Sequence, residues 1–232
     1  MTIRDIQVAL SWLGYRPGAL DGVWGRKTAA ALRQFQANHG LDPDGVAGPM
    51  TLAALFPHGQ KAAAPLDDPA LVWFQEARRL MGVKETPGAA NNATILDWAG
   101  DLGIPYKGDD IPWCGLFVGH CISVTLDREP VPSSLLSARA WESFGVRTGA
   151  TAGAVMVFWR KSPGSGLGHV GFYAGEDEGA YRILGGNQSD KVSLAWVAKD
   201  RLVSARWPAS LPPTVPRPVM VSRTEGLSSN EA

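Results

Sequence analysis

Cysteine is scarce in this sequence. The chain has 232 residues and two cysteines, Cys114 and Cys121. They stand seven positions apart in a segment with a helical pattern, where the rise per residue separates them by about 10 Å, too far for a disulfide. The sequence therefore offers no disulfide framework, and this favours synthesis in a reducing compartment.

An excess of either charge is also missing, since Lys+Arg and Asp+Glu number 22 each. This balance excludes the basic surface that is typical of nucleic-acid-binding proteins, and it provides no attraction to an anionic membrane. We therefore expect no nucleic-acid partner, no stable membrane association and a monomer. A polymer partner would be recognised by shape and hydrogen bonds.

Long apolar runs are missing as well. The N-terminal stretch MTIRDIQVAL lacks the basic region, the apolar core and the cleavage site of a secretory signal, and no segment is apolar enough to span a membrane. We therefore expect synthesis in the cytoplasm without a signal peptide. Hydrophobic residues nevertheless make up 45% of the chain, which is enough for a folded core in one ordinary domain and a smaller one.

Two copies of one pattern occur within the first sixty residues. The segment DGVWGRKTAAAL, which begins at Asp21, is echoed by DGVAGPMTLAAL, which begins at Asp44. Each copy indicates an Asp-Gly turn that leads into a helix, and an apolar periodicity over residues 6–13 predicts one earlier helix. The sequence therefore predicts a small three-helix module.

This doubled pattern resembles the peptidoglycan-binding domain of cell-wall hydrolases, over residues 3–56. The resemblance implies bacterial peptidoglycan as the partner, and it places Asp21, Trp24 and Asp44 near the ligand. Turn chemistry alone also explains the two aspartates, because Asp before Gly stabilises a turn through its own side chain. Both interpretations stay open at this point.

Composition divides the chain into four parts. We expect a peptidoglycan-binding module over residues 1–57 and a linker rich in alanine and proline over residues 58–69. Residues 70–207 hold the remaining periodic segments and form the predicted second, larger domain. Residues 208–232 contain five prolines and end in polar residues, so we expect a flexible tail there.

The order of the periodic segments in the larger part is helices first and strands after. Helical periods occur at residues 71–81, 95–102, 113–126 and 135–144, and short β-rich runs follow at residues 154–159, 169–174, 181–184 and 192–196. Helices followed by consecutive strands predict an α+β fold, with helices packed on an antiparallel β-sheet.

The segment DDIPWCGLFV, residues 109–118, places a cysteine directly after a proline-containing loop, at the start of an apolar helix. Unpaired N–H groups and the helix dipole at such a terminus lower the pKa of a thiol and can hold an oxyanion. Cys114 is therefore the candidate nucleophile. We interpret Cys121 as an inert thiol of the core.

Four histidines are available as a base for this thiol. His39 and His58 lie in the module and the linker, and His120 points away from the cysteine around the predicted helix. His169 opens a strand after a glycine-rich loop, and it is the remaining candidate. Asn187 ends the next strand, and antiparallel pairing of the two strands would bring its amide beside the imidazole.

The order W-C-x-x-F-V, G-H-V-G-F and G-G-N-Q resembles the CHAP domain of papain-like cell-wall hydrolases, over residues 70–207. The resemblance implies that Cys114 is the nucleophile, that His169 is the general base and then the acid, and that Asn187 orients the imidazole. Some members of that family carry a glutamate at the position of Gly185, two residues before the asparagine. The identity of the third polar partner therefore stays open.

Three further residues, Trp113, Glu85 and Asp110, are candidate substrate contacts because they lie in or beside the loops that flank the cysteine. Glu85 can instead cap a turn. Calcium at Asp109 and Asp110 is disfavoured, since adjacent acids lack the alternating oxygen ligands of a calcium loop. Zinc is disfavoured because no C-x-x-C or H-E-x-x-H spacing occurs, so we expect no metal and no cofactor.

The two resemblances together imply an endolysin-like peptidoglycan hydrolase that cuts an amide bond through a cysteine thioester. The bond can be the one between N-acetylmuramic acid and L-alanine, or a peptide bond of the stem. A phage or a bacterial origin fits, with action on the wall in the periplasm or outside the cell. The alternatives are a catalytically inactive wall-binding or phage-tail structural protein, and acyl transfer to an amine.

Overall fold

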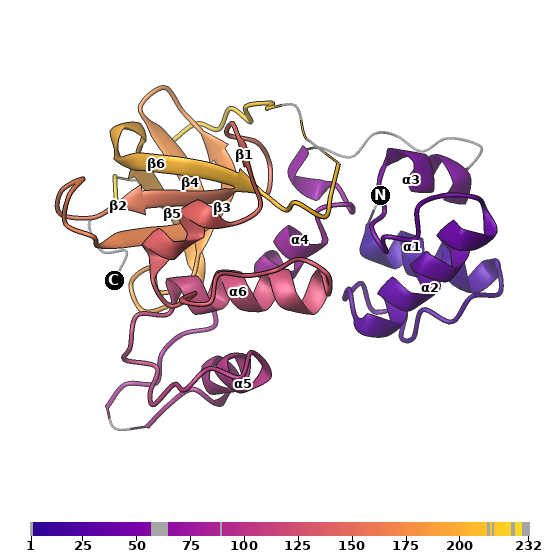
Figure 1. Cartoon of the computed structure of the whole chain (residues 1–232), viewed down its shortest axis with the longest axis horizontal. Helices are drawn as coiled ribbons and strands as arrows, with labels where there is room; N and C mark the ends of the chain where they lie inside the picture. The colour runs from indigo at the N-terminus through magenta and orange to yellow at the C-terminus, as the bar shows by residue number, and fades with distance from the viewer. Residues whose placement is uncertain are drawn as a thin grey trace. The chain divides into compact units, whose positions relative to one another are not determined.

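A computed structural model describes residues 2–56, 65–88, 90–212, 214, 216–223 and 226–228 of the chain. The chain divides into two compact units (Figure 1). The first unit comprises Met1–Arg79 with Val124–Asp127, and the second comprises Leu80–Ser123 with Arg128–Ala232. Most of the predicted linker lies outside the described residues. In its described part, Pro65–Asp67 form a 3₁₀ helix, η1.

The first unit begins with the three helices that the repeat predicts. They are α1 (Ile3–Trp12), α2 (Arg26–Asn38) and α3 (Pro49–Leu55), and α4 (Val72–Arg79) follows. Thr2 caps α1 in a capping box with Asp5, and a proline opens α3, where its missing N–H costs nothing. The prediction of a small helical module is confirmed.

A glutamine from the preceding helix holds the first Asp-Gly turn of the module. Gln7 Nε2 donates hydrogen bonds to Asp21 Oδ1 (3.3 Å), the carbonyl of Val23 (2.9 Å) and Thr28 Oγ1 (3.2 Å). Its Oε1 accepts from the N–H of Gly22 (2.8 Å). One buried side chain thus ties the turn to the helix that follows it.

The second copy repeats this network with Gln36. Its Nε2 donates to Asp44 Oδ1 (2.7 Å), the carbonyl of Val46 (2.9 Å) and Thr51 Oγ1 (3.1 Å). Its Oε1 accepts from the N–H of Gly45 (2.8 Å). The sequence duplication is therefore a structural duplication, in which each turn has its own buried glutamine.

The second unit is an α+β domain, as the sequence predicts. Its described residues form a six-stranded sheet with the order β1-β6-β2-β3-β4-β5, and neighbouring strands are antiparallel. The strands are β1 (Val146–Thr148), β2 (Val155–Trp159), β3 (Gly168–Glu176), β4 (Ala180–Gly185), β5 (Ser193–Ala198) and β6 (Leu202–Trp207). A short 3₁₀ helix, η3 (Lys199–Arg201), connects β5 to β6.

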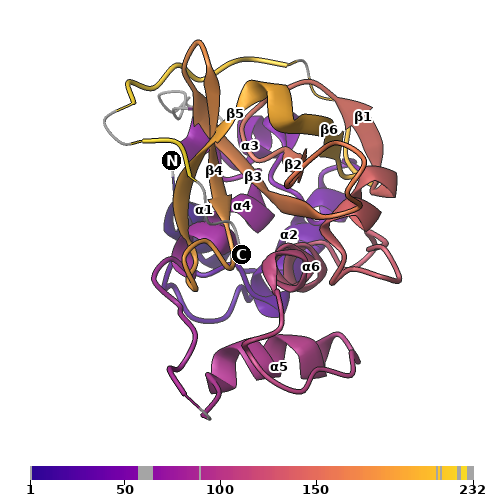
Figure 2. The ribbon, with the colours of Figure 1, turned by 90° about the vertical axis from the view of Figure 1, so that its left-hand side faces the viewer.

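Two helices of this unit lie on one side of the sheet. In Figures 1 and 2, α6 (Cys114–Thr125) lies between the sheet and α5 (Ala93–Asp101). Phe117 of α6 contacts Phe172 of β3, with ring centroids 6.1 Å apart. On the other side of α6, His120 stacks on Trp98 of α5 at 5.1 Å. The helix that begins with the candidate nucleophile is thus packed on both sides.

The second residue of α6 is a glycine because a backbone oxygen occupies the space of a side chain. A Cβ on Gly115 would lie 1.9 Å from the carbonyl oxygen of Leu135, which also accepts a hydrogen bond from Trp141 Nε1 (2.9 Å). We predict that Gly115→Ala lowers the free energy of unfolding by about 3 kcal/mol or more, since a fixed carbonyl cannot yield to a methyl group.

Gly119→Ala, one turn further along α6, is the matched control for this prediction. There a Cβ would lie 3.3 Å from the tip of the Leu135 side chain, which can adjust, and alanine favours a helix by about 1 kcal/mol over glycine. Chemical denaturation measures both variants. Equal denaturation midpoints for the two would contradict this explanation of Gly115.

Three details of the predicted secondary structure are wrong, and one of them is the absence of the short strand β1 from the prediction. Residues 135–144 are not an α-helix, because Ser137 has an extended backbone (φ −77°, ψ 114°) and only the 3₁₀ helix η2 (Ala138–Ser143) follows it. Strand β6 is absent from the prediction. It contains a buried Arg206, whose guanidinium donates to the carbonyls of Phe144 (2.6 Å) and Gly145 (3.0 Å), so a charged side chain is tolerated inside the sheet.

Part of the segment predicted as a tail makes hydrogen bonds with the sheet. The N–H of Glu176 in β3 donates to the carbonyl of Val219, and the N–H of Val221 donates to the carbonyl of Glu176, both at 2.9 Å. A Cβ on Gly175 would lie 2.6 Å from the Val221 side chain, so this approach requires a glycine. The flexibility of residues 208–232 stays a prediction.

Among the described helices, none is long and apolar enough to cross a membrane.

Candidate active site

Cys114 is the first residue of α6, where the sequence places it. Its sulfur accepts a hydrogen bond from the backbone N–H of Val170 in β3. The residue before Val170 is His169, so this contact brings the cysteine against the part of the strand that carries the candidate base. Cys114 exposes 3% of its surface, and neither cysteine is in a disulfide.

The pKa of the Cys114 thiol is raised, chiefly because burial penalises the thiolate. The N–H groups of Val170 and Gly115 and the charge of Arg160 act in the opposite direction. The N–H groups at the helix start thus act in the predicted direction, but the net pKa is raised, since removal of water from the sulfur has the larger effect. A neutral thiol of this kind needs a base when it attacks.

His169 lies in β3 and has no exposed surface. Its Nε2 lies 3.0 Å from Oε1 of Gln188. An amide oxygen can only accept a hydrogen bond, so in this pair Nε2 carries the proton and donates a hydrogen bond to Gln188 Oε1. A neutral imidazole with its proton on Nε2 has Nδ1 as its basic nitrogen, and this form can take a proton from a thiol.

The amide of Gln188 is itself oriented by the sheet. Its Nε2 donates to the carbonyl oxygens of Ser193 and Ile183, and this leaves Oε1 to face His169. Sequence reasoning quoted this glutamine within G-G-N-Q but assigned no role to it. Gln188 is therefore the residue that supplies the third polar group beside the imidazole.

Asn187 makes different contacts, although it is only one residue away. With its amide nitrogen facing Glu85, Nδ2 donates to Glu85 Oε1 (3.0 Å) and Oδ1 accepts from the N–H of Trp113 (3.3 Å). Its backbone is left-handed, with φ 55°, a conformation that asparagine tolerates better than most residues. The structure thus brings Asn187 to the loop before the cysteine, and its predicted orienting role stays a prediction.

Gly185 leaves the room that the His169–Gln188 pair requires. A Cβ at this position would lie 3.0 Å from His169 Nε2 and 2.9 Å from Gln188 Oε1. In this chain the glutamine amide approaches the imidazole in place of a side chain from residue 185.

Glu85 and Trp113, two of the predicted substrate contacts, bind each other. Trp113 is fully buried, and its Nε1 donates to Glu85 Oε1 at 2.8 Å. The pKa of Glu85 is raised, first by burial, while the Trp113 hydrogen bond lowers it and the charges of Asp190, Asp109 and Asp110 raise it further. Any contact of these two residues with substrate stays a prediction.

Asp109 has a structural role. It is buried, and its Oδ2 accepts from the N–H groups of Thr86 (2.9 Å) and Asn92 (2.7 Å). These bonds fix the segment that follows Glu85 and the start of α5. Within the ranges that the structure describes, no three His, Cys, Asp or Glu side chains gather where they could hold a metal ion.

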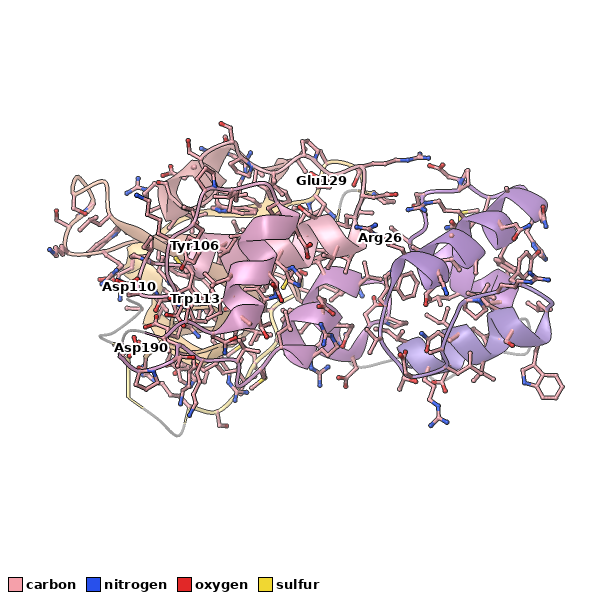
Figure 3. All side chains as sticks on the ribbon, turned by 90° about the horizontal axis from the view of Figure 1, so that it is seen from below. Arg26, Tyr106, Asp110, Trp113, Glu129 and Asp190 are labelled. Carbon is pink, nitrogen blue, oxygen red and sulfur yellow. The ribbon has the colours of Figure 1, made fainter. Side chains whose placement is uncertain are left out.

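Asp110 is exposed and lies in the same neighbourhood as the nucleophile. Figure 3 shows Tyr106, Asp110, Trp113 and Asp190 in one region of the second unit. The pKa of Tyr106 is raised chiefly by burial, and the charges of nearby Asp109, Glu85, Asp110 and Cys114 add to the effect. The acids of these loops and Cys114 all influence the pKa of Tyr106, so they lie around the same side chain.

The other histidines that the structure describes have packing roles. His39 stacks on Phe35, with ring centroids 4.0 Å apart, and its Nδ1 lies 2.8 Å from the Phe35 carbonyl. His120 is buried against Trp98, on the face of α6 away from the sheet. His58 lies outside the described residues.

The predicted ligand contacts of the N-terminal module are engaged within the module itself. Asp21 and Asp44 each accept from their own turn, through the N–H groups of Val23 (2.9 Å) and Val46 (2.8 Å), and this supports their structural role. Trp24 exposes 3% of its surface. Contact of these residues with a ligand stays a prediction.

Comparison with known proteins finds similarity for the N-terminal module of the chain. Residues 2–55 match the family model described as a putative peptidoglycan binding domain. The chain is 41% identical over 60 residues to a probable N-acetylmuramoyl-L-alanine amidase of Bacillus licheniformis, an alignment that covers 23% of this chain and 17% of that protein. It is 45% identical over 49 residues to a spore cortex-lytic enzyme of Oceanobacillus iheyensis, with 21% and 18% covered.

A further relative is the N-acetylmuramoyl-L-alanine amidase CwlM of Mycobacterium tuberculosis, which is 39% identical over 54 residues, with 23% of this chain and 13% of that protein covered. The alignments thus span less than a fifth of these relatives, and they concern the binding module. No solved structure matches the chain. The resemblance of residues 70–207 to CHAP domains stays a prediction.

Proposed function

We propose that this protein is a peptidoglycan hydrolase that cuts an amide bond of the bacterial cell wall with Cys114 as nucleophile. One observation carries the proposal: the Cys114 sulfur lies against the N–H of Val170, next to His169, and the Nε2 of His169 is paired with Gln188. A thiol at a helix start, a neutral histidine and an amide that orients it together support acyl transfer.

The reaction begins when Nδ1 of His169 takes the proton of the Cys114 thiol and the sulfur attacks the carbonyl carbon of the amide. Negative charge then forms on the carbonyl oxygen, where N–H groups at the start of α6 can stabilise it. The imidazolium gives its proton to the leaving amine, the C–N bond breaks, and a thioester remains on the sulfur.

Water completes the reaction in the same site. His169 takes a proton from the water molecule, the hydroxide adds to the thioester carbonyl, and the C–S bond breaks to give a carboxylic acid and the free thiol. The charge of Arg160 favours the thiolate form of Cys114, so it supports the first step and the departure of sulfur in the second.

The binding module supports peptidoglycan as the substrate. Because residues 2–55 match a putative peptidoglycan binding domain, the same chain that carries the cysteine also has a module for the polymer. Two relatives are named N-acetylmuramoyl-L-alanine amidases, and this favours that linkage over a stem-peptide bond. Endolysin-like action on the wall, in the periplasm or outside the cell, after synthesis in the cytoplasm, belongs to the same proposal.

Mass spectrometry of purified peptidoglycan after digestion tests the proposal. We expect the wild-type protein to produce new termini, with Cys114→Ala inactive and Cys121→Ala active as the matched control. A free amino group on L-alanine identifies the amidase, and a terminus within the stem identifies an endopeptidase. Equal digestion by Cys114→Ala would refute the mechanism. Wall binding by the wild type without any cleavage would favour the inactive wall-binding alternative.

A further inference from the structure

One carboxylate oxygen connects the two loops that carry the candidate catalytic groups. Glu85 Oε1 accepts hydrogen bonds from Trp113 Nε1 (2.8 Å) and from Asn187 Nδ2 (3.0 Å). Trp113 directly precedes the nucleophile in the chain, and Asn187 directly precedes Gln188. The contact therefore joins the residue before the thiol to the residue before the group that orients the imidazole.

The segment around Glu85 is itself fixed in the second unit. The N–H of Glu85 donates to the carbonyl of Asp190 (2.9 Å), and the N–H of Thr86 donates to Asp109 Oδ2 (2.9 Å). Asp109 is buried, so this anchor is sheltered from water. Glu85 is thus held by its backbone while its side chain holds two other loops.

These contacts form a closed ring around the candidate site. In order, the ring runs through Glu85, Trp113, Cys114, Val170, His169, Gln188 and Asn187, and back to Glu85. Three links join chain neighbours and four are hydrogen bonds, two of which meet at Glu85. Glu85 is the one member of this ring that makes two of its hydrogen bonds with a single oxygen.

We propose that Glu85 is a positioning residue, whose ionised carboxylate keeps the Cys114 loop and the Gln188 loop in register for the attack of the thiol on its substrate. The inference rests on the function proposed above. Hydrogen bonds to a charged acceptor are roughly twice as strong as those between neutral groups, so the ionised form holds the two loops more firmly than the neutral acid does.

Protonation of the Glu85 carboxylate makes the site sensitive to acid. Burial raises the pKa of Glu85, the Trp113 hydrogen bond lowers it, and the carboxylates of Asp190, Asp109 and Asp110 raise it. The net shift is upward, so Glu85 takes a proton at a less acidic pH than an ordinary glutamate. The positioning effect is therefore present at neutral pH and is lost as the pH falls through this raised pKa.

Three variants of the full chain test the proposal: Glu85→Ala, Glu85→Gln and, as matched control, Asp190→Asn. The side chain of Asp190 acts on Glu85 through its charge, and the substitution keeps the backbone carbonyl that accepts the N–H of Glu85. The backbone of residue 190 has φ 61°, which asparagine tolerates. Two assays are run from mildly acidic to neutral pH. The first measures the rate at which iodoacetamide alkylates Cys114, which needs no substrate, and the second measures kcat and KM on peptidoglycan fragments. Thermal unfolding shows whether each variant is folded.

We expect Glu85→Ala to lower kcat by about 10- to 100-fold, the range seen when a supporting hydrogen bond is removed, with a slower alkylation of Cys114 and little change in KM. Glu85→Gln keeps an oxygen for both donors but carries no charge, so its kcat at neutral pH should lie between those of Glu85→Ala and the wild type. The fall in rate at acidic pH that protonation of Glu85 causes should be absent from this variant. Asp190→Asn should keep the rate at neutral pH. Because it removes a charge that raises the pKa of Glu85, the fall in rate at acidic pH should shift to lower pH.

A wild-type alkylation rate and kcat in Glu85→Ala would overturn the proposal. So would a raised KM with unchanged kcat and alkylation, because this pattern assigns Glu85 to substrate contact. Slower alkylation in Glu85→Ala, restored in part in Glu85→Gln, would uphold the positioning role even if the wild-type protein cleaves no peptidoglycan, and that combination would refute the proposed function alone.

Discussion

Cys114→Ala, His169→Ala and the double variant should lose amide hydrolysis by nearly the same factor, about 10³-fold or more each. The reason is that burial keeps the Cys114 thiol neutral, so the sulfur attacks only after the histidine has taken its proton. Removal of either group disables the same step, so the second substitution causes little further loss of rate.

Initial rates on a soluble peptidoglycan fragment, with thermal unfolding of each variant, measure this non-additivity. Both side chains are buried, so unfolding temperatures show whether a variant is folded before its rate is interpreted. If the loss in the double variant equals the product of the two single losses, Cys114 and His169 act independently. That result would contradict their pairing as nucleophile and base.

Gln188→Ala should lower kcat by about 100-fold with little change in KM. Without Oε1, the proton on His169 Nε2 has no acceptor there, so neither the ring orientation nor the protonated nitrogen is fixed. Gln188→Glu should not restore activity, because the second carboxylate oxygen would face the carbonyls of Ser193 and Ile183, which need a donor.

Comparison with Asn187→Ala makes this prediction specific. Asn187 contacts Glu85 and the N–H of Trp113, so its loss should weaken the positioning of the loops without removing the acceptor of the imidazole. We expect the smaller loss of kcat in Asn187→Ala. The reverse order of the two losses, in variants of equal stability, would return the orienting role to Asn187.

The sequence predicts the fold where its patterns are regular. Val155–Trp159 is recognisable because it is a run of branched and aromatic residues between glycine-containing segments, and Ser193–Ala198 is a similar run that follows one. Strand β6 was missed because Ser204 and Arg206 interrupt its apolar pattern, and the arginine is accepted only through carbonyl groups 61 and 62 positions earlier in the chain. Such partners are set by tertiary structure.

The candidate site shows the same division. A loop-to-helix cysteine and a strand histidine can be found from local pattern, and the structure brings Cys114 against β3 at Val170, next to His169. Whether residue 187 or residue 188 faces the imidazole depends on the left-handed backbone of Asn187, which turns one side chain aside. The pattern G-G-N-Q alone does not decide this.

Long-range contacts of polar side chains were the least predictable. Glu85 meets Trp113 across 28 positions of sequence, and no periodicity relates the two. In the module the aspartates of the repeat were evident, but Gln7 and Gln36 were not, because they belong to the preceding helices and lie outside the repeated segments. A repeat identifies a turn more readily than the side chain that holds it.

The central claim is that the sulfur of Cys114 is the atom that attacks the wall. Titration with iodoacetamide tests it directly, when mass spectrometry measures the alkylated fractions of Cys114 and Cys121 and the same samples are assayed on peptidoglycan. We predict that the remaining activity equals the unmodified fraction of Cys114 at every point and is independent of Cys121. Undiminished cleavage by protein with fully alkylated Cys114 would contradict the claim.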